Sequence, residues 1–233
     1  MAAVYKREMR MYFLSPVVYV LTGVFMLLTS VFFIRDNIFS QSSNFLGILF
    51  IMAIIMLIVL PILTMKTMAE ERKNGTEVLL ITSSVSVTKI ILGKFLAAFS
   101  VFMMMTILTI PYVIILVIFA TPNLAAIIAG YVGYILLCSC YIAMGIFFSC
   151  LVDSQIISAV VSILVLFLML MMKYVSPMFG GFISSILDWV SILSRYDEFT
   201  IGYISLGPVV YYLSFITLFV FFSIRTIENR RMH

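Results

Sequence analysis

The sequence predicts an all-α integral membrane protein with six transmembrane helices. Apolar residues make up 64% of its 233 residues and charged residues only 10%, against about 25% charged in ordinary soluble domains. The mean hydropathy is +1.24. A soluble fold of this length could not hide so much apolar surface, so we expect lipid to be its solvent. The apolar runs do not alternate with a period of two, which excludes a membrane β-barrel.

Six apolar runs have about the 17–25 residues that a helix needs to cross a bilayer. In lipid such a run must satisfy its own backbone hydrogen bonds, as a helix does. We treat residues 1–233 as a single transmembrane domain. The predicted spans are residues 17–34, 45–65, 95–119, 124–150, 155–172 and 208–224.

The distribution of basic residues predicts the orientation. If both termini are cytoplasmic, only Arg35, Lys173 and Arg195 of the 14 Lys and Arg residues lie outside. Cytoplasmic loops carry such an excess of Lys and Arg. The net charge of +4 then describes a face near anionic lipid, not a nucleic-acid surface. We therefore expect a multi-pass protein of the plasma membrane with both termini inside.

Residues 1–14 form a short amphipathic segment before the first span. Lys6, Arg7 and Arg10 fall on one side of a helix, whereas Tyr12 can face the membrane interface. Pro16 marks a break or a first turn, because proline lacks the backbone N–H. Two readings stay open: a topology signal with headgroup anchoring, or an interfacial helix that leads into the first span through an elbow.

The most polar stretch, residues 66–94, lies between the second and third spans. The Asn74-Gly75 pair indicates a turn. Thr76 can then cap a new helix, with Glu77 near its positive end. Residues 78–81 are apolar, and residues 82–84 end the helix. Such a helix either lies flat in the cytoplasmic lipid interface or docks in a groove on a protein partner.

Two features of the following spans concern packing. Pro111 lies inside the third span and should kink it, most simply as a static bend. The fourth span is rich in small residues, which allow close helix approach. These are Ala125, Ala126, Ala129, Gly130, Gly133, Ser139, Ala143 and Gly145.

Residues 173–207 are mostly apolar but hold no run long enough to cross the bilayer. We predict two short helices that dip into the outer leaflet and return before the sixth span, an extracellular re-entrant pair. Such a broken backbone must be buried in protein or border a wet cavity. This favours an outer gate over a simple anchor. The candidate gate residues are Asp188, Arg195, Tyr196, Asp197 and Glu198.

The sequence lacks the motifs of an enzyme or an autonomous pump. Its only histidine is His233, and it has no P-loop and no GxSxG motif. No acid lies near the centre of a span, where a proton relay would need one. Cys138, Cys140 and Cys150 have no partners suited to a metal site. We therefore expect a non-catalytic chain that binds no metal or cofactor and takes its energy from elsewhere.

Four stretches carry a family resemblance. They read RExxxYFLSPVVYV from Arg7, EERKNGTEVLLITS from Glu70 with IILGKF, YDEFTIGYISL from Tyr196 followed by VVYYLS, and RTIENRR from Arg225. In this order they resemble the permease subunits of type-2 ATP-binding-cassette (ABC) exporters, in the branch of gliding-motility and sodium-exporter permeases. Departures from the family pattern at Ser84, Val87, 207–208 and Met232 leave the cargo open.

The resemblance implies a permease that couples to a separate cytoplasmic ATPase through residues 70–82. Residues 76–82 would be the coupling helix, and Asp153 a lesser second contact. The implied coupling residues are Glu70, Glu71, Arg72, Lys73, Gly75, Thr76, Glu77, Val78, Leu79, Leu80, Thr82 and Asp153.

The implied complex holds two ATPase subunits and two permease chains, either identical or related, in a bacterial plasma membrane. ATP and Mg²⁺ would bind on the ATPase, and cargo would pass between the permeases. Lipid is an expected partner and nucleic acid is not. The alternative is a non-transporting scaffold or sensor that recruits a cytoplasmic ATPase, whereas a membrane enzyme lacks any catalytic set.

Overall fold

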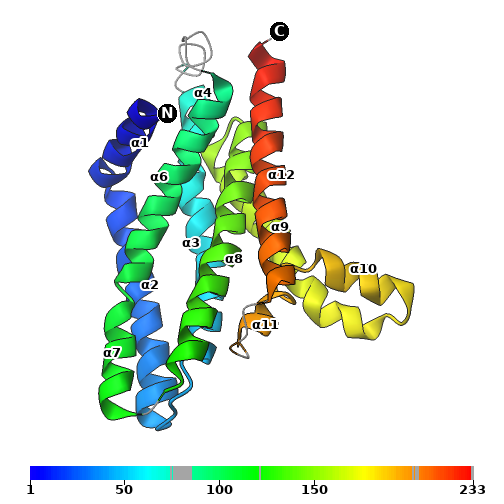
Figure 1. The fold of residues 1–233 in the computed structure, drawn as a ribbon. Coiled ribbons are helices and arrows are strands. Elements are labelled where there is room, and N and C mark those ends of the chain that lie inside the picture. The colour runs from blue at the N-terminus through cyan, green and yellow to red at the C-terminus, as the bar shows by residue number, and fades with distance from the viewer. Residues whose placement is uncertain (74, 76–85, 121, 201, 203–204, 232–233) are drawn as a thin grey trace.

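The computed structural model describes residues 1–73, 75, 86–120, 122–200, 202 and 205–231. Every regular element within these ranges is a helix (Figure 1). Six helices in the described chain are long and apolar enough to cross a membrane. The predicted all-α class and the six transmembrane helices are therefore confirmed.

Four of the six crossing helices consist of two consecutive helical elements, α2 with η1, α3 with α4, α6 with α7 and α9 with η2, and three short helices of the described chain lie outside them. The helices are α1 (Ala2–Leu14), α2 (Pro16–Phe33), η1 (Ile34–Phe39), α3 (Leu46–Thr64), α4 (Lys66–Lys73), α6 (Val87–Ile107), α7 (Ile110–Phe119), α8 (Leu124–Leu151), α9 (Gln155–Val175), η2 (Ser176–Met178), α10 (Phe182–Val190), α11 (Tyr196–Thr200) and α12 (Leu206–Arg231).

The second and third crossing helices extend further toward residues 74–86 than the apolar runs predict. The second continues through α4 to Lys73, and the third begins at Val87 instead of residue 95. The physical reason is that these added turns are covered by protein. Thr67 and Glu71 of α4 are buried, as are Val87, Ile90 and Ile91 of α6.

Helix α8 is the central helix of the bundle and packs against α3, α9, α11 and α12. Its predicted small residues are buried, apart from Ala125. At Gly145 an added Cβ would overlap Thr64 Oγ1 of α3, and at Gly133 it would overlap the Phe199 ring of α11. The small residues therefore serve close packing within the chain.

The third crossing helix is broken at Leu108–Thr109, just before Pro111, where α6 ends and α7 begins. Thr109 Oγ1 donates a hydrogen bond to the Thr106 carbonyl at 2.6 Å and satisfies one of the acceptors at the break. The third crossing helix is thus interrupted next to Pro111, where the sequence predicts a disturbance of the helix.

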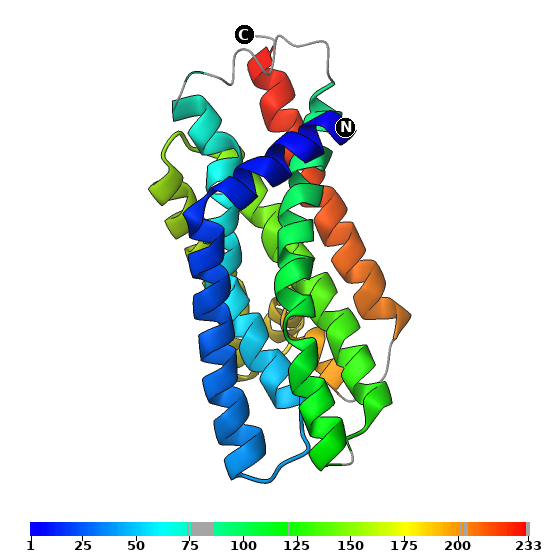
Figure 2. The same cartoon turned by 90° about the vertical axis from the view of Figure 1, so that its left-hand side faces the viewer.

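One end of the bundle gathers segments that are far apart in the sequence. Helix α1, α4, the start of α6 and the end of α12 all lie at the top of Figure 1. Figure 2 shows α1 crossing this end of the bundle obliquely. At the break between α1 and α2, Ser15 has an extended backbone and Pro16 occupies the first turn of α2.

Between the fifth and sixth crossing helices lie α10 and α11. Helix α10 packs against α9 and η2, and this part projects sideways from the bundle in Figure 1. Trp189 of α10 is 63% exposed. Helix α11 instead packs against α8. Two short helices thus stand where the sequence predicts them, and their position relative to a bilayer stays a prediction.

Candidate functional site

The candidate site is the end of the bundle where α4 and α6 flank residues 74–86. Helix α4 carries the predicted coupling residues Glu70–Lys73, and Gly75 follows it with a φ of +69°. A side chain is strained at such a φ, so glycine suits this turn. The predicted coupling residues Thr76, Glu77, Val78, Leu79, Leu80 and Thr82 lie outside the described residues.

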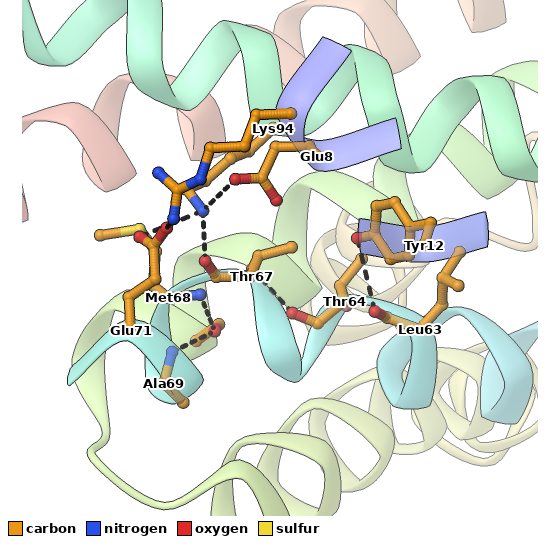
Figure 3. Close-up of polar contacts among 11 residues, drawn as sticks. Glu8, Tyr12, Leu63, Thr64, Thr67, Met68, Ala69, Glu71 and Lys94 are labelled. Atoms are coloured by element: carbon orange, nitrogen blue, oxygen red, sulfur yellow. Dashed lines mark hydrogen bonds and ion pairs between the residues drawn. The ribbon is translucent and has the colours of Figure 1, made fainter. Parts of the chain in front are cut away.

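A buried ion cluster joins α1, α4 and α6 (Figure 3). Lys94 of α6 is fully buried, and its Nζ lies 2.8 Å from Glu8 Oε1 of α1 and 3.2 Å from Glu71 Oε2 of α4. The ammonium also donates to the Thr67 carbonyl at 2.5 Å. Arg7 Nη2 donates to Glu71 Oε1 at 3.0 Å. Two cations and two carboxylates thus meet, and their charges balance.

Burying these charges is costly unless they are paired and hydrogen-bonded. Glu8 and Glu71 have side chains only 4% and 7% exposed, whereas that of Arg7 is 49% exposed. The inner ion pairs are therefore shielded from solvent, and the outer Arg7–Glu71 pair is not. The Glu8–Lys94 pair joins α1 to α6, the helix that follows residues 74–86. The Glu71–Lys94 pair joins α6 to α4, the helix that precedes them.

Further contacts fix α1 along α6. Tyr5 Oη and Ser100 Oγ are 3.0 Å apart. An added Cβ on Gly93 would lie 3.0 Å from Val4 Cγ1, which shows how closely the two helices approach. Helix α1 is therefore packed on the bundle along its length.

The sequence suggested that Tyr12 faces the membrane interface. In the structure it is buried and faces the bundle instead. It stands one helical turn after Glu8, so both side chains share the inward face of α1. Its hydroxyl donates to the Leu63 carbonyl at 3.5 Å. Burial, together with the nearby Glu8 carboxylate, raises the pKa of the Tyr12 phenol above its usual range, so the hydroxyl stays protonated. Lys6 and Arg10 are exposed, as expected.

Helix α4 is also fixed to α8. Ser149 Oγ of α8 accepts hydrogen bonds from the backbone N–H groups of Met68 and Ala69, each at 3.1 Å, and donates to the Met65 carbonyl at 3.2 Å. The first N–H groups of a helix have no partner within it. Ser149 of α8 therefore accepts from two of the first backbone N–H groups of α4.

Two of the predicted coupling residues, Arg72 of α4 and Asp153 after α8, contact each other. The Arg72 guanidinium donates to Asp153 Oδ1 at 2.8 Å, to the Val152 carbonyl at 3.1 Å and to the Cys150 carbonyl at 2.9 Å. A cation is favourable at the C-terminal end of a helix, here α8. The Arg72 side chain is 12% exposed and that of Asp153 is 80% exposed. Arg72 thus holds the end of α8 in place, while Asp153 stays accessible.

At the opposite side of the bundle, the structure gathers most of the predicted outer-gate residues. Lys173 Nζ lies 2.7 Å from Asp197 Oδ1, and Arg195 Nη1 lies 3.9 Å from Glu198 Oε1. Ser205 hydrogen-bonds to Glu198. Tyr196 is fully buried, and burial raises the pKa of its phenol. Asp188 is exposed on α10.

Sequence reasoning missed Glu8, Lys94 and Ser149 as members of the site. Two signals pointed to the charged pair: Glu8 is the only acid in a basic segment, and Lys94 directly precedes a long apolar run. A charge in either place needs a partner when lipid or protein covers it. The partners themselves are 86 residues apart.

These features define a multi-pass helical membrane protein that holds a buried ion cluster beside the connection between two crossing helices. A family model described as ABC-2 family transporter protein matches residues 29–224, and the chain belongs to this family. It is therefore an ABC transporter permease. Members of the family generally work with a cytoplasmic ATPase and dimerise. No curated protein matches the chain.

Proposed function

We propose that this permease is the transmembrane subunit of an ABC exporter, in the branch of gliding-motility and sodium-exporter permeases. Two permease chains, identical or related, form the translocation pathway. Two cytoplasmic ATPase subunits bind ATP and Mg²⁺ and dock on residues 70–82, with Asp153 as a second contact. The end that carries the ion cluster faces the cytoplasm in this proposal.

The observation that carries the proposal is the ion cluster between α4 and α6, the helices on either side of residues 74–86. The Lys94–Glu71 pair joins α4 to α6, and the Lys94–Glu8 pair adds α1. Ser149 and Arg72 join α4 to α8. A force on residues 74–86 would therefore move α1, α4, α6 and α8 together instead of bending α4 or α6 alone.

Such a joint suits the way that ATP-driven domain motions reach a membrane. Switching transitions move packed elements as rigid bodies, because packed cores deform little. We infer that closure of the ATPase subunits moves the coupling segment, and that α4, α6, α1 and α8 pass this movement to the spans. In this scheme α1 is the interfacial helix, and the cluster around Asp197 and Glu198 is the outer gate.

The coupling segment provides the direct test. In vesicles that hold the permease and its ATPase, replacement of Glu77 and Leu79 by alanine is expected to lower the ATPase rate toward that of the free ATPase. The reason is that these residues would supply the charged and apolar contacts of the docking helix. The measurement is ATP hydrolysis by the ATPase with and without each permease variant.

A matched control is Ile118→Ala, because Ile118 lies on α7 and is 70% exposed. It should leave the stimulation of ATP hydrolysis unchanged. Unchanged stimulation in the Glu77→Ala and Leu79→Ala double variant would contradict the coupling role of residues 70–82. Stable ATPase binding without any stimulation by the unaltered permease would favour a scaffold.

A further inference from the structure

A cavity of about 310 Å³ lies between the α1–α2 elbow and the junction of α3 with α4. Its volume falls at the lower end of the range of about 300–1,000 Å³ that small-molecule sites occupy. Helix α1 and the first turn of α2 form one wall, and the end of α3 and the start of α4 form the other. The cavity is distinct from residues 74–86.

The lining of the cavity has an apolar part and a polar part. Val17, Val18, Ile62 and Leu63 lie on the side of the spans, and Lys66 and Glu70 lie on the first turns of α4. The span of α2 begins at this level, and Leu14 at the elbow is 73% exposed. Apolar spans begin where lipid headgroups meet the acyl chains. The cavity therefore lies at headgroup depth.

The charges of the polar part are available to a ligand. Lys66 Nζ has a single long contact in the described chain, to Ser15 Oγ at 3.5 Å. Glu70 forms no ion pair among the described residues. Glu8 also lines the cavity, but its carboxylate lies 2.8 Å from Lys94. The cavity thus offers one ammonium and one carboxylate at neighbouring turns of a helix.

We propose that this cavity binds the headgroup of a zwitterionic glycerophospholipid. The phosphate accepts from Lys66 Nζ, and the primary ammonium of an ethanolamine headgroup donates to the Glu70 carboxylate. The start of the acyl chains lies along Val17, Val18, Ile62 and Leu63. Charge-assisted hydrogen bonds of this kind are short and strong. The site goes beyond the proposed transport function, and it shares Glu70 with the predicted coupling residues 70–82.

Native mass spectrometry of the purified full chain in detergent tests the site. The probes are phosphatidylethanolamine, phosphatidylglycerol and inorganic phosphate. The unaltered chain is expected to retain phosphatidylethanolamine at least about tenfold better than phosphatidylglycerol, because only the former offers an ammonium to Glu70. Lys66→Met should weaken retention of both lipids about tenfold. Glu70→Gln should remove the preference between them.

Matched controls are Lys89→Met and Glu228→Gln, which remove the same charges outside the cavity and should leave retention unchanged. Lys66→Arg keeps the charge and should keep phosphatidylethanolamine bound, which separates a binding role from a folding role. Equal retention of both lipids by the unaltered chain would overturn the proposal. Release of the bound lipid by millimolar inorganic phosphate would also overturn it, because the site would then recognise a free anion.

Discussion

Replacing Lys94 by methionine is expected to lower the free energy of unfolding by about 3–5 kcal/mol, the cost of removing one partner from a buried ion pair. Lys94 Nζ is fully buried and faces the carboxylates of Glu8 and Glu71. Methionine has a similar length but leaves the Glu8 carboxylate buried without a cation. The measurement is the thermal unfolding midpoint of the purified chain in detergent.

A charge-balanced variant separates electrostatics from packing. Adding Glu8→Gln to Lys94→Met removes the second charge of the pair, while Glu71 keeps its contact with Arg7 at 3.0 Å. The double variant should therefore be more stable than Lys94→Met alone. Lys89→Met is the control, because Lys89 is exposed on the same helix. A Lys94→Met protein as stable as this control would show that the cluster does not stabilise the fold.

Gly145→Val is expected to destabilise the bundle by about 3 kcal/mol, near the upper end of the range for overpacking. An added Cβ at this position would overlap Thr64 Oγ1, and α3 and α8 would have to separate to admit the larger side chain. Thr64 cannot swing aside freely, because its hydroxyl donates to the Leu60 carbonyl at 3.0 Å. The thermal unfolding midpoint again provides the measurement.

Gly23→Val is the matched control for Gly145→Val. An added Cβ on Gly23 meets nothing within 4 Å, so this variant should stay within about 1 kcal/mol of the unaltered chain. The account of α8 as a closely packed central helix would be contradicted if the two variants were equally stable.

The sequence predicts the crossing helices because each depends on a local property, the length of an apolar run. The small residues of α8 are also a local property. Close packing of helices needs them whichever helix is the partner, so the sequence alone predicts their role. Pro111 likewise reports a break in the third crossing helix from its own chemistry. These features need no knowledge of how the helices are arranged.

The ion cluster could not be predicted, because its pairs depend on how α1 lies across the bundle. Sequence reasoning grouped Arg7 with Lys6 and Arg10 on one side of the first helix and gave it no partner, whereas it contacts Glu71 of α4. It also treated Lys94 as one more basic residue of the polar stretch, although this residue is fully buried. At the other side, Arg195, Asp197 and Glu198 were predicted from their clustering, but the partner of Asp197 is Lys173, 24 residues earlier.

The most direct test of the proposal asks which side of the membrane the ion cluster faces. Lys73, at the exposed end of α4, and Ser40, near the opposite end of the bundle, can each be replaced by cysteine. The native residues Cys138, Cys140 and Cys150 are buried and should add little background. A membrane-impermeant maleimide applied to intact cells should label Ser40→Cys at once, and Lys73→Cys only after the membrane is permeabilised. Labelling of Lys73→Cys in intact cells would contradict a cytoplasmic ATPase that acts through residues 70–82.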